Sequence, residues 1–437
     1  MSSSPLSLAV VGGGIAGVTL TIALLKHCPH ISVTLYESAS AFGEIGAGVG
    51  FEPVMVRTME LIDSRIKDAF EKCTRGNVES DQPKWFEVRV GDQRKVLSGS
   101  DGVVVKKQGR EVKLDEELFV IQARRGPRGG VHRAHFLDEL VKLVPEGVAQ
   151  FRKKLINVTK AEDGSGDAVL HFEDGTTAQH TAVLGCDGIK SRTRAIVLGE
   201  SDATAAVFSG KYAYRGLIPM AKAVEIVGDI NPRECQMFVG YHGHLLTFPI
   251  ANGTIFNVVA FSSRPTWDNA QWVVQTSRED MLEDFKEWGP TVVSIMQNLQ
   301  KPDIWALFNH PPAPTYLSTE PSICLVGDAA HASTPHQGSG AGMCIEDVYI
   351  LSQLLVQASM KSEIQKSFEA YDAVRRPRSQ NLVKTSREAG MLWEFEDEIA
   401  GDDLEKLEAN ATKRMNWIWG HDIGKDLAEA MKLIKKE

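Results

Sequence analysis

The feature that most constrains this chain is a glycine-rich turn between a predicted strand and a predicted helix near the N-terminus. Residues 6–11 are apolar and predict a buried strand, and residues 15–27 have the pattern of a helix. Between and just inside them stand Gly12, Gly14 and Gly17, spaced as GxGxxG. The first glycine permits a tight turn, the second lets a pyrophosphate approach the backbone, and the third lets helix and strand pack. The helix N-terminus adds partial positive charge, so the unit predicts a dinucleotide site.

A second strand, predicted at residues 31–36, completes a βαβ unit and places Glu37 at its end. Glu37 stands twenty residues after Gly17, where an acidic side chain can bind a ribose hydroxyl. Glycine-rich turns also occur without a ligand, but strand, helix and acid together favour a dinucleotide over an ordinary turn. The motif by itself leaves open whether that dinucleotide is NAD or FAD.

Composition and charge argue against several classes of protein. The 437-residue chain has 43% hydrophobic and 24% charged residues, which is typical of globular proteins. Its net charge of −9 and the lack of a long Lys/Arg run argue against a nucleic-acid partner. No segment has the apolar length of a spanning helix, and we expect neither a secretory signal nor a membrane partner. The six scattered cysteines lack CxxC spacing, which argues against a metal site and suits a reducing, cytoplasmic compartment.

Two later segments each contain an apolar run that ends in an acid beside a glycine. Residues 181–194 contain Asp187-Gly188, and residues 323–342 contain Gly327-Asp328. Either pair alone could be an ordinary turn. There is no second GxGxxG and no CxxxxC, which disfavours proteins with a dedicated NAD(P)H domain.

In this order, the three motifs resemble those of the single-component FAD-dependent aromatic hydroxylases, a family typified by para-hydroxybenzoate hydroxylase. The resemblance implies an α/β fold in which a Rossmann-like FAD-binding domain carries an inserted antiparallel β-sheet substrate domain and C-terminal helices. We expect the FAD-binding domain at residues 1–80, 105–198 and 300–365. The substrate domain is then expected at 81–104 and 199–299, and the C-terminal helical segment at 366–437.

The same resemblance implies which residues bind the cofactor. It assigns Glu37 to the adenosine ribose, Asp328 to the ribityl chain, and Asp187 to both FAD and the reducing nicotinamide. Arg133, in VHRAHFLDEL, matches an arginine that contacts FAD in the family. Backbone contacts are expected at two further glycine-rich places, formed by Gly46, Gly48 and Gly50 and by Gly338, Gly340, Ala341 and Gly342. FAD is expected to bind tightly without a covalent bond, whereas NAD(P)H binds transiently and O2 is the second co-substrate.

Several stretches, among them FSGKYAYRGLIPM and QMFVGYHGHLLTFPIANG, closely resemble salicylate hydroxylases, and fungal phenol hydroxylases that dearomatise polyketide rings share most of them. Hydroxylation needs a phenolate, so the site needs a cation or hydrogen-bonding group near that oxygen. Arg215 could pair with a phenolate or carboxylate, and Tyr241, on a neighbouring predicted strand, could assist. A surface ion pair and plain core packing are the alternative interpretations of these two residues. The Pro335 carbonyl is a further expected substrate contact, and Trp85, Phe86 and Arg89 are expected to line the aromatic pocket.

The resemblance also implies a reaction. NAD(P)H reduces FAD, oxygen adds to give a flavin C4a-hydroperoxide, and a phenol is hydroxylated at the ortho or ipso carbon. The leading hypothesis is conversion of salicylate into catechol with loss of carbon dioxide. The alternatives are hydroxylation of a larger phenolic metabolite, including oxidative dearomatisation of a polyketide phenol, and a FAD oxidase that does not hydroxylate. The sequence leaves open the choice of NADH or NADPH and of monomer or homodimer.

Overall fold

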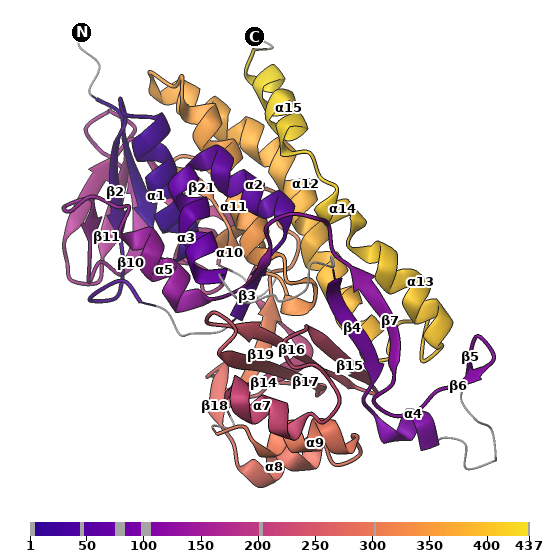
Figure 1. Ribbon diagram of the computed structural model, residues 1–437. Coiled ribbons are helices and arrows are strands. Elements are labelled where there is room, and N and C mark those ends of the chain that lie inside the picture. Colours follow the sequence, from indigo (N-terminus) through magenta and orange to yellow (C-terminus); the bar gives the residue numbers. More distant parts are fainter. Residues whose placement is uncertain are drawn as a thin grey trace.

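The computed structural model describes residues 5–43, 48–74, 84–97, 106–200, 204–300 and 303–435. Figure 1 shows two lobes, an upper one that holds both ends of the chain and a lower one built on a large sheet. The chain opens with β1 (Ser7–Val11), α1 (Ile15–His27) and β2 (Ser32–Tyr36). These elements lie where the glycine-rich pattern predicts them, and the α/β fold is confirmed.

The upper lobe is built on a six-stranded sheet in the order β20-β21-β13-β1-β2-β9. All neighbouring strands in it are parallel except β20 and β21. Leu8 and Val10 pack in the cluster formed with the helices, whereas Ala9 and Val11 pack against a three-stranded sheet on the other face. Because both faces are buried, β1 is apolar at successive positions. The remaining strands of these two sheets are β9 (Ala149–Gln150), β10 (Leu155–Lys160), β11 (Ala168–Phe172), β12 (Thr177–His180), β13 (Ala182–Gly185), β20 (Leu317–Thr319) and β21 (Ser322–Leu325).

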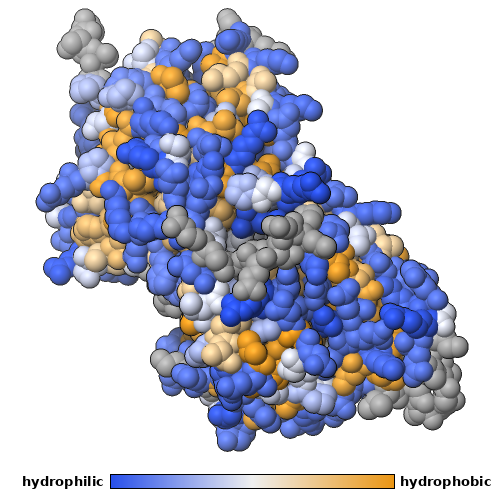
Figure 2. All heavy atoms as spheres, viewed as in Figure 1, coloured by the Kyte–Doolittle hydropathy of each residue, from blue (hydrophilic) through white to orange (hydrophobic). Residues whose placement is uncertain are grey.

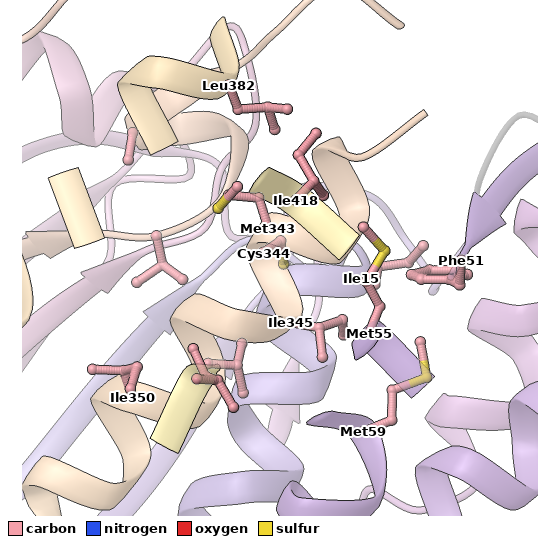
Figure 3. Close-up of a cluster of buried hydrophobic side chains, with 14 of the residues drawn as sticks. Ile15, Phe51, Met55, Met59, Met343, Cys344, Ile345, Ile350, Leu382 and Ile418 are labelled. Carbon is pink, nitrogen blue, oxygen red and sulfur yellow. The ribbon is translucent and has the colours of Figure 1, made fainter. Parts of the chain in front are cut away.

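Helices cover the other face of the six-stranded sheet and pack closely on one another. Figure 3 shows Met55 and Met59 of α2 (Pro53–Ile62) in the same buried cluster as Ile345 of α11 (Gly340–Leu355). A Cβ added at Gly342 would lie 2.1 Å from the Met55 Sδ, so the two helices can approach this closely only with glycine there. The other helices of this lobe are α3 (Ser64–Thr74), α5 (Arg133–Val141), α6 (Arg192–Leu198) and α10 (Asp328–His331).

The lower lobe is an eight-stranded sheet in the order β18-β19-β14-β17-β16-β15-β4-β7. Its neighbours are antiparallel except β15 and β4, which are parallel. The sheet also contains β7 (Glu117–Gln122) and β19 (Asp303–Asn309), which the expected boundaries placed in the FAD-binding domain. Those boundaries need correction, since backbone pairing across the sheet recruits both strands. The other strands are β4 (Lys84–Val90), β14 (Val207–Pro219), β15 (Gln236–Gly240), β16 (Gly243–Ile250), β17 (Ile255–Ser263) and β18 (Val273–Gln275).

Three helices close the outer face of the eight-stranded sheet: α7 (Met220–Ile226), α8 (Arg278–Asp284) and α9 (Pro290–Gln297). Together with side chains such as Tyr214, Phe238 and Trp288 they form a second buried cluster. Short elements complete the lobes: β3 (Gly48–Phe51), α4 (Gln93–Leu97), β5 (Lys106–Lys107), β6 (Arg110–Glu111) and β8 (Gly129–His132).

The C-terminal helices run along the side of both lobes (Figure 1). They are α12 (Lys361–Trp393), α13 (Leu404–Arg414), α14 (Asn416–Trp419) and α15 (Ile423–Lys435). Arg375 of α12 is fully buried and pairs with Glu346, Asp347 and Asp426. These ion pairs fix α12 to α11 and α15. No described helix has the length and apolarity needed to cross a membrane, and Figure 2 shows a mostly hydrophilic face with apolar residues in small groups.

Candidate active site

A cavity of about 720 Å³ is lined by residues of both lobes. The upper lobe contributes the β1–α1 turn, the carboxyl end of β13 and the first turn of α11, and the lower lobe contributes β14, β16 and β17. Ligands of parallel α/β sheets bind at the carboxyl ends of the strands, which is where this cavity lies. The predicted binding residues that line it are Gly12, Gly14, Glu37, Gly48, Gly50, Arg133, Asp187, Arg215, Asp328, Pro335, Gly338, Gly340 and Ala341.

The glycines of the β1–α1 turn have different roles. Gly12 has φ +106°, and a Cβ there would lie 2.4 Å from the Cys186 carbonyl oxygen, so the turn requires glycine. Gly14 is the N-cap of α1, and a Cβ there would meet nothing within 4 Å. A Cβ at Gly17 would lie 1.9 Å from the Gly12 carbonyl oxygen. Gly17 therefore serves helix packing and does not line the cavity, whereas Gly14 leaves an open cradle for a ligand.

Glu37 lies at the end of β2 and faces this turn. Its Oε2 accepts a hydrogen bond from the Gly13 N–H at 2.6 Å, and its Oε1 accepts one from the Ala39 N–H at 2.6 Å. The carboxylate is thereby held beside the N-terminus of α1. Oε1 also accepts from the Ser38 hydroxyl at 3.0 Å, so Oε2 keeps the lone pair that can accept a hydroxyl of a ribose.

Asp187 uses its carboxylate to build the start of α6. Its Oδ1 accepts hydrogen bonds from the hydroxyls of Ser191 and Thr193, and its Oδ2 accepts them from the backbone N–H groups of Arg192 and Thr193. Each oxygen already has two donors, so a ligand meets this turn through the backbone of Cys186 to Gly188. Asp187 thus lines the cavity as predicted, while its carboxylate is used within the protein.

Asp328 offers a hydrogen-bond acceptor to the cavity, and the first turn of α11 offers hydrogen-bond donors. The Asp328 carboxylate is exposed at the cavity, and no hydrogen bond to it is formed by the described residues. Gly340 and Ala341 bring backbone N–H groups at a helix N-terminus, which favour negative charge. The Asp328 carboxylate can accept hydrogen bonds from the hydroxyls of the FAD polyol chain. The N–H groups at the start of α11 can stabilise negative charge that develops on the FAD ring.

These features together fit an extended dinucleotide. Gly14 and Gly50 present backbone with open space at the Cβ position, and Glu37 and Asp328 supply carboxylates at two separate points of the cavity. Cationic side chains, including Arg133 and Lys190, also line it. Gly46 falls outside the described residues. Gly342 lies behind the cavity wall against Met55, so its predicted cofactor contact is corrected to a packing role.

Arg215 places a positive charge on the wall formed by the lower lobe. Its guanidinium carbon lies 4.8 Å from the centre of the Trp305 ring, and its Nε is buried without a hydrogen-bond partner. The pKa of Arg215 is lowered to about 10, first by burial and second by the positive charge of Arg133. Arg215 is half-buried, and none of the described acidic side chains forms an ion pair with it, so this arrangement favours an anionic ligand.

The rest of this wall is apolar. Trp85 and Phe86 line the cavity as expected, whereas Arg89, on the same strand, turns away to pair with Glu87 at 2.8 Å. Pro335 also lines the cavity, and its carbonyl already accepts a hydrogen bond from the Gly338 N–H at 2.9 Å. The other apolar lining residues of the lower lobe are Met237, Leu246, Phe248, Val259 and Phe261. These side chains give the lower-lobe wall an apolar, partly aromatic surface.

Tyr241 does not line the cavity, and its predicted contact with the substrate is corrected. Its hydroxyl donates to Asp402 at 2.5 Å, its backbone N–H donates to Asp92, and its ring packs against Phe395. The tight turn between β15 and β16 carries Tyr241 past the end of the strands. The register of this hairpin, which the sequence does not specify, decides the outcome.

Two cavity residues were missed by sequence reasoning. Glu52, at the start of α2, is 8% exposed, its Oε2 has no partner, and burial raises its pKa to about 7. His336, next to Pro335, is 4% exposed and neither ring nitrogen has a partner. Within the sequence PHQG, a substrate contact was predicted for Pro335 and not for His336. No sequence signal distinguishes Glu52 from a surface acid.

Comparison with known proteins agrees with this geometry. Residues 314–386 match the family model described as FAD binding domain. The chain is 40% identical to FAD-dependent monooxygenase orf3 of Aspergillus niger, over 100% of this chain and 98% of that protein. It is 37% identical to a salicylate hydroxylase of Pseudomonas putida, over 97% of this chain and 94% of that protein. Among solved structures, a salicylate hydroxylase substrate complex superposes with a TM-score of 0.83 at 32% identity, covering 98% of each chain.

Proposed function

Because this chain belongs to the FAD-dependent monooxygenases related to salicylate hydroxylase, we propose that it hydroxylates a phenol at the ortho or ipso carbon. The leading substrate is salicylate, which becomes catechol with loss of carbon dioxide. NAD(P)H is the proposed electron donor and O2 the oxygen donor. When bound, FAD supplies the redox chemistry and the activation of oxygen.

The observation that carries the proposal is the half-buried charge of Arg215, which forms no ion pair with the described acidic side chains. A phenolate is far more electron-rich than a phenol, and a cation beside its oxygen favours the ionised form. Arg215 can hold a phenolate or an adjacent carboxylate through two parallel N–H donors. Its stacking on Trp305 keeps the guanidinium plane fixed, so the anion is oriented as well as bound.

The remaining wall of the cavity orients the ring and excludes water. Trp85, Phe248 and Phe261 present apolar surface to the same cavity as the glycine-rich turn. Excluding water strengthens the interaction between Arg215 and the bound anion, because the local dielectric constant is lower. The Pro335 carbonyl retains one lone pair and can accept a hydrogen bond from a substrate hydroxyl.

The test is oxidation of NADH and of NADPH by the FAD-loaded protein with a panel of phenols, with products identified by mass. Release of catechol and carbon dioxide from salicylate supports the leading substrate. A product that gains one oxygen and keeps its carbon dioxide supports the alternative, a larger phenolic metabolite that is hydroxylated or dearomatised. If no phenol stimulates NAD(P)H oxidation, hydroxylation is overturned in favour of a non-hydroxylating FAD oxidase.

A further inference from the structure

Side chains from four neighbouring strands form a floor to the 720 Å³ cavity. Arg215 of β14 is paired with Val259 of β17. Val259 is paired in turn with Leu246 of β16, and Leu246 with Met237 of β15. Residues paired in this way point to the same face of a sheet, and all four line the cavity. Because neighbouring strands lie about 4.8 Å apart, this floor extends about 14 Å across the sheet.

The two ends of the floor differ in character. The guanidinium of Arg215 lies over Trp305 of β19, on the side of β14 away from β17, so it does not shorten the span. At the other end, Cys235 precedes Met237 by two residues, points to the same face and also lines the cavity. The Cys235 end therefore lies three strands away from the arginine that binds the anion.

Glu52, at the start of α2, lines the cavity beside this far end. Burial raises the pKa of the Cys235 thiol to about 12, and the charges of Glu234 and Glu52 add to the increase, so these groups are close to one another. Glu52 is 8% exposed, and its Oε2 is buried without a hydrogen-bond partner among the described residues. Buried polar atoms nearly always have a partner, so this oxygen on a cavity wall points to a ligand atom or a water.

The charge state of Glu52 decides which ligand group suits it. Burial raises the pKa of Glu52 to about 7, and the positive charge of Arg128 opposes the increase, so both forms exist at neutral pH. A hydroxyl can donate to the carboxylate or accept from the acid, whereas a carboxylate ligand suits only the acid. An ammonium ligand is disfavoured by the positive charges nearby. The charged side chains that line this end of the cavity with Glu52 are Lys84, Arg128, Arg233 and Glu234.

We propose that Glu52 forms a distal subsite for a hydroxyl group of the substrate, an inference that rests on the proposed hydroxylation. The phenol oxygen binds at Arg215, the second hydroxyl binds at Glu52, and the apolar skeleton lies over Leu246 and Met237. A single benzene ring is too short to reach both ends of the floor. The substrate class is therefore a phenol with a second ring, or a side chain of similar length, that carries a hydroxyl. Salicylate binds at Arg215 alone.

The test compares two phenols that differ only in the distal hydroxyl. The FAD-loaded protein is titrated with para-hydroxybiphenyl and with para,para′-dihydroxybiphenyl by isothermal titration calorimetry, which needs no turnover. We expect the wild type to bind the diol at least tenfold more tightly. Glu52→Leu should bind the two ligands with dissociation constants within twofold of each other. Glu52→Gln keeps a donor and an acceptor and should retain most of the preference, and Glu60→Leu, at an exposed position of α2, is the control.

Equal affinity of the wild type for the two biphenyls overturns the distal subsite, and so does a Glu52→Leu variant that keeps the preference. If Glu52→Leu fails to fold, Cys235→Phe decides, because its ring should fill the same end of the cavity. Cys235→Phe should weaken binding of the diol at least tenfold relative to salicylate, and an unchanged ratio overturns the subsite.

The same measurements separate this inference from the proposed function. If salicylate is turned over but the diol is not preferred, the subsite is overturned and the hydroxylation stands. If the preference for the diol depends on Glu52 but no phenol stimulates NAD(P)H oxidation, the binding site stands and the hydroxylation is overturned.

Discussion

The guanidinium of Arg215 stacks on Trp305, with 4.8 Å between the guanidinium carbon and the ring centre. Arg215 lies on β14 and Trp305 on β19, and Trp305 is the backbone partner of Ala213, two residues before Arg215. Side chains two residues apart share one face of a sheet, so the pairing of these strands sets the stack. The charge that defines the substrate end of the cavity is therefore held by two strands about ninety residues apart.

Replacement of Arg215 tests its role as the anion-binding group. Arg215→Ala removes a charged hydrogen-bond donor, which is worth about 1.5–3 kcal/mol, so kcat/KM for the phenol should fall roughly 10- to 150-fold. The FAD absorbance spectrum should not change. Steady-state kinetics and spectra check both. Arg110→Ala, at a side chain that is 75% exposed, is the control, and unchanged turnover in Arg215→Ala would remove this residue from the site.

Two glycines of one turn should respond differently to the same substitution. Gly14→Ala meets open space and should cost less than about 1 kcal/mol of unfolding free energy, yet its methyl group obstructs the pyrophosphate cradle. We expect at least a tenfold rise in the FAD dissociation constant. Gly17→Ala places a Cβ against the Gly12 carbonyl and should cost about 1–3 kcal/mol or more. Thermal unfolding of the apo-protein and FAD titration separate the two effects, and equal destabilisation would contradict the assignment.

Glu52 should make stability fall as the pH rises. Burial raises its pKa from the usual 4.5 to about 7, so between these values the folded state holds a proton that the unfolded state has lost. As the pH rises from 4.5 to 7, the free energy of unfolding therefore falls, by up to about 3 kcal/mol. The Glu52→Gln variant has no such titration. The difference in unfolding free energy between the variant and the wild type should therefore increase in favour of the variant from pH 4 to pH 8. Denaturant unfolding at several pH values measures this, with Glu60→Gln as the exposed control.

Neighbouring arginines on α12 provide a matched pair. Arg375→Met removes a buried cation shared by Glu346 and Asp347, which keep only Arg378 and His331 as side-chain partners among the described residues, and should cost about 3–5 kcal/mol of unfolding free energy. Arg376→Met breaks a partly exposed pair with Asp372 and should cost about 0–1 kcal/mol. Urea unfolding of both variants checks the difference. Similar losses would show that the buried cluster does not fix the C-terminal helices.

Tyr241→Phe tests the correction to the predicted site. The hydroxyl is bonded to Asp402 and lies outside the cavity, so kcat/KM should stay within about twofold of the wild type. Stability should fall by about 1 kcal/mol because the hydrogen bond is lost. A loss of hydroxylation comparable to that of Arg215→Ala would restore Tyr241 to the site.

The cavity residues that belong to local motifs were predictable. In the β1–α1 turn and at the start of α11, the same few residues set the backbone shape and line the cavity, and neither feature depends on distant pairing. Asp187 shows the limit of such motifs. Its place at the cavity follows from the strand before it, but the use of its carboxylate depends on Ser191 and Thr193, which a pattern of spacing does not reveal.

The part of the cavity lined by the lower lobe was not predictable in this way, because its residues come from strands that are distant in sequence. Tyr241 and His244 lie three residues apart, yet the first points to Asp402 and the second lies behind the cavity wall beside His336. Glu394, expected in a separate helical segment, is buried against β16. Local propensity does not encode these contacts, since they arise from strand register and from the packing of α12 on both lobes.

The sequence by itself determined the α/β class, the dinucleotide turn and the order of the three cofactor motifs, because short-range backbone geometry dictates each of them. Only the tertiary structure decided which side chains of the lower lobe face the cavity. In that structure Arg215 lies over Trp305, Tyr241 lies outside the cavity, and His336, His244 and Glu394 lie close together. The physical reason is that burial and long-range pairing, which no local pattern specifies, decide which polar groups face the cavity and which are satisfied within the protein.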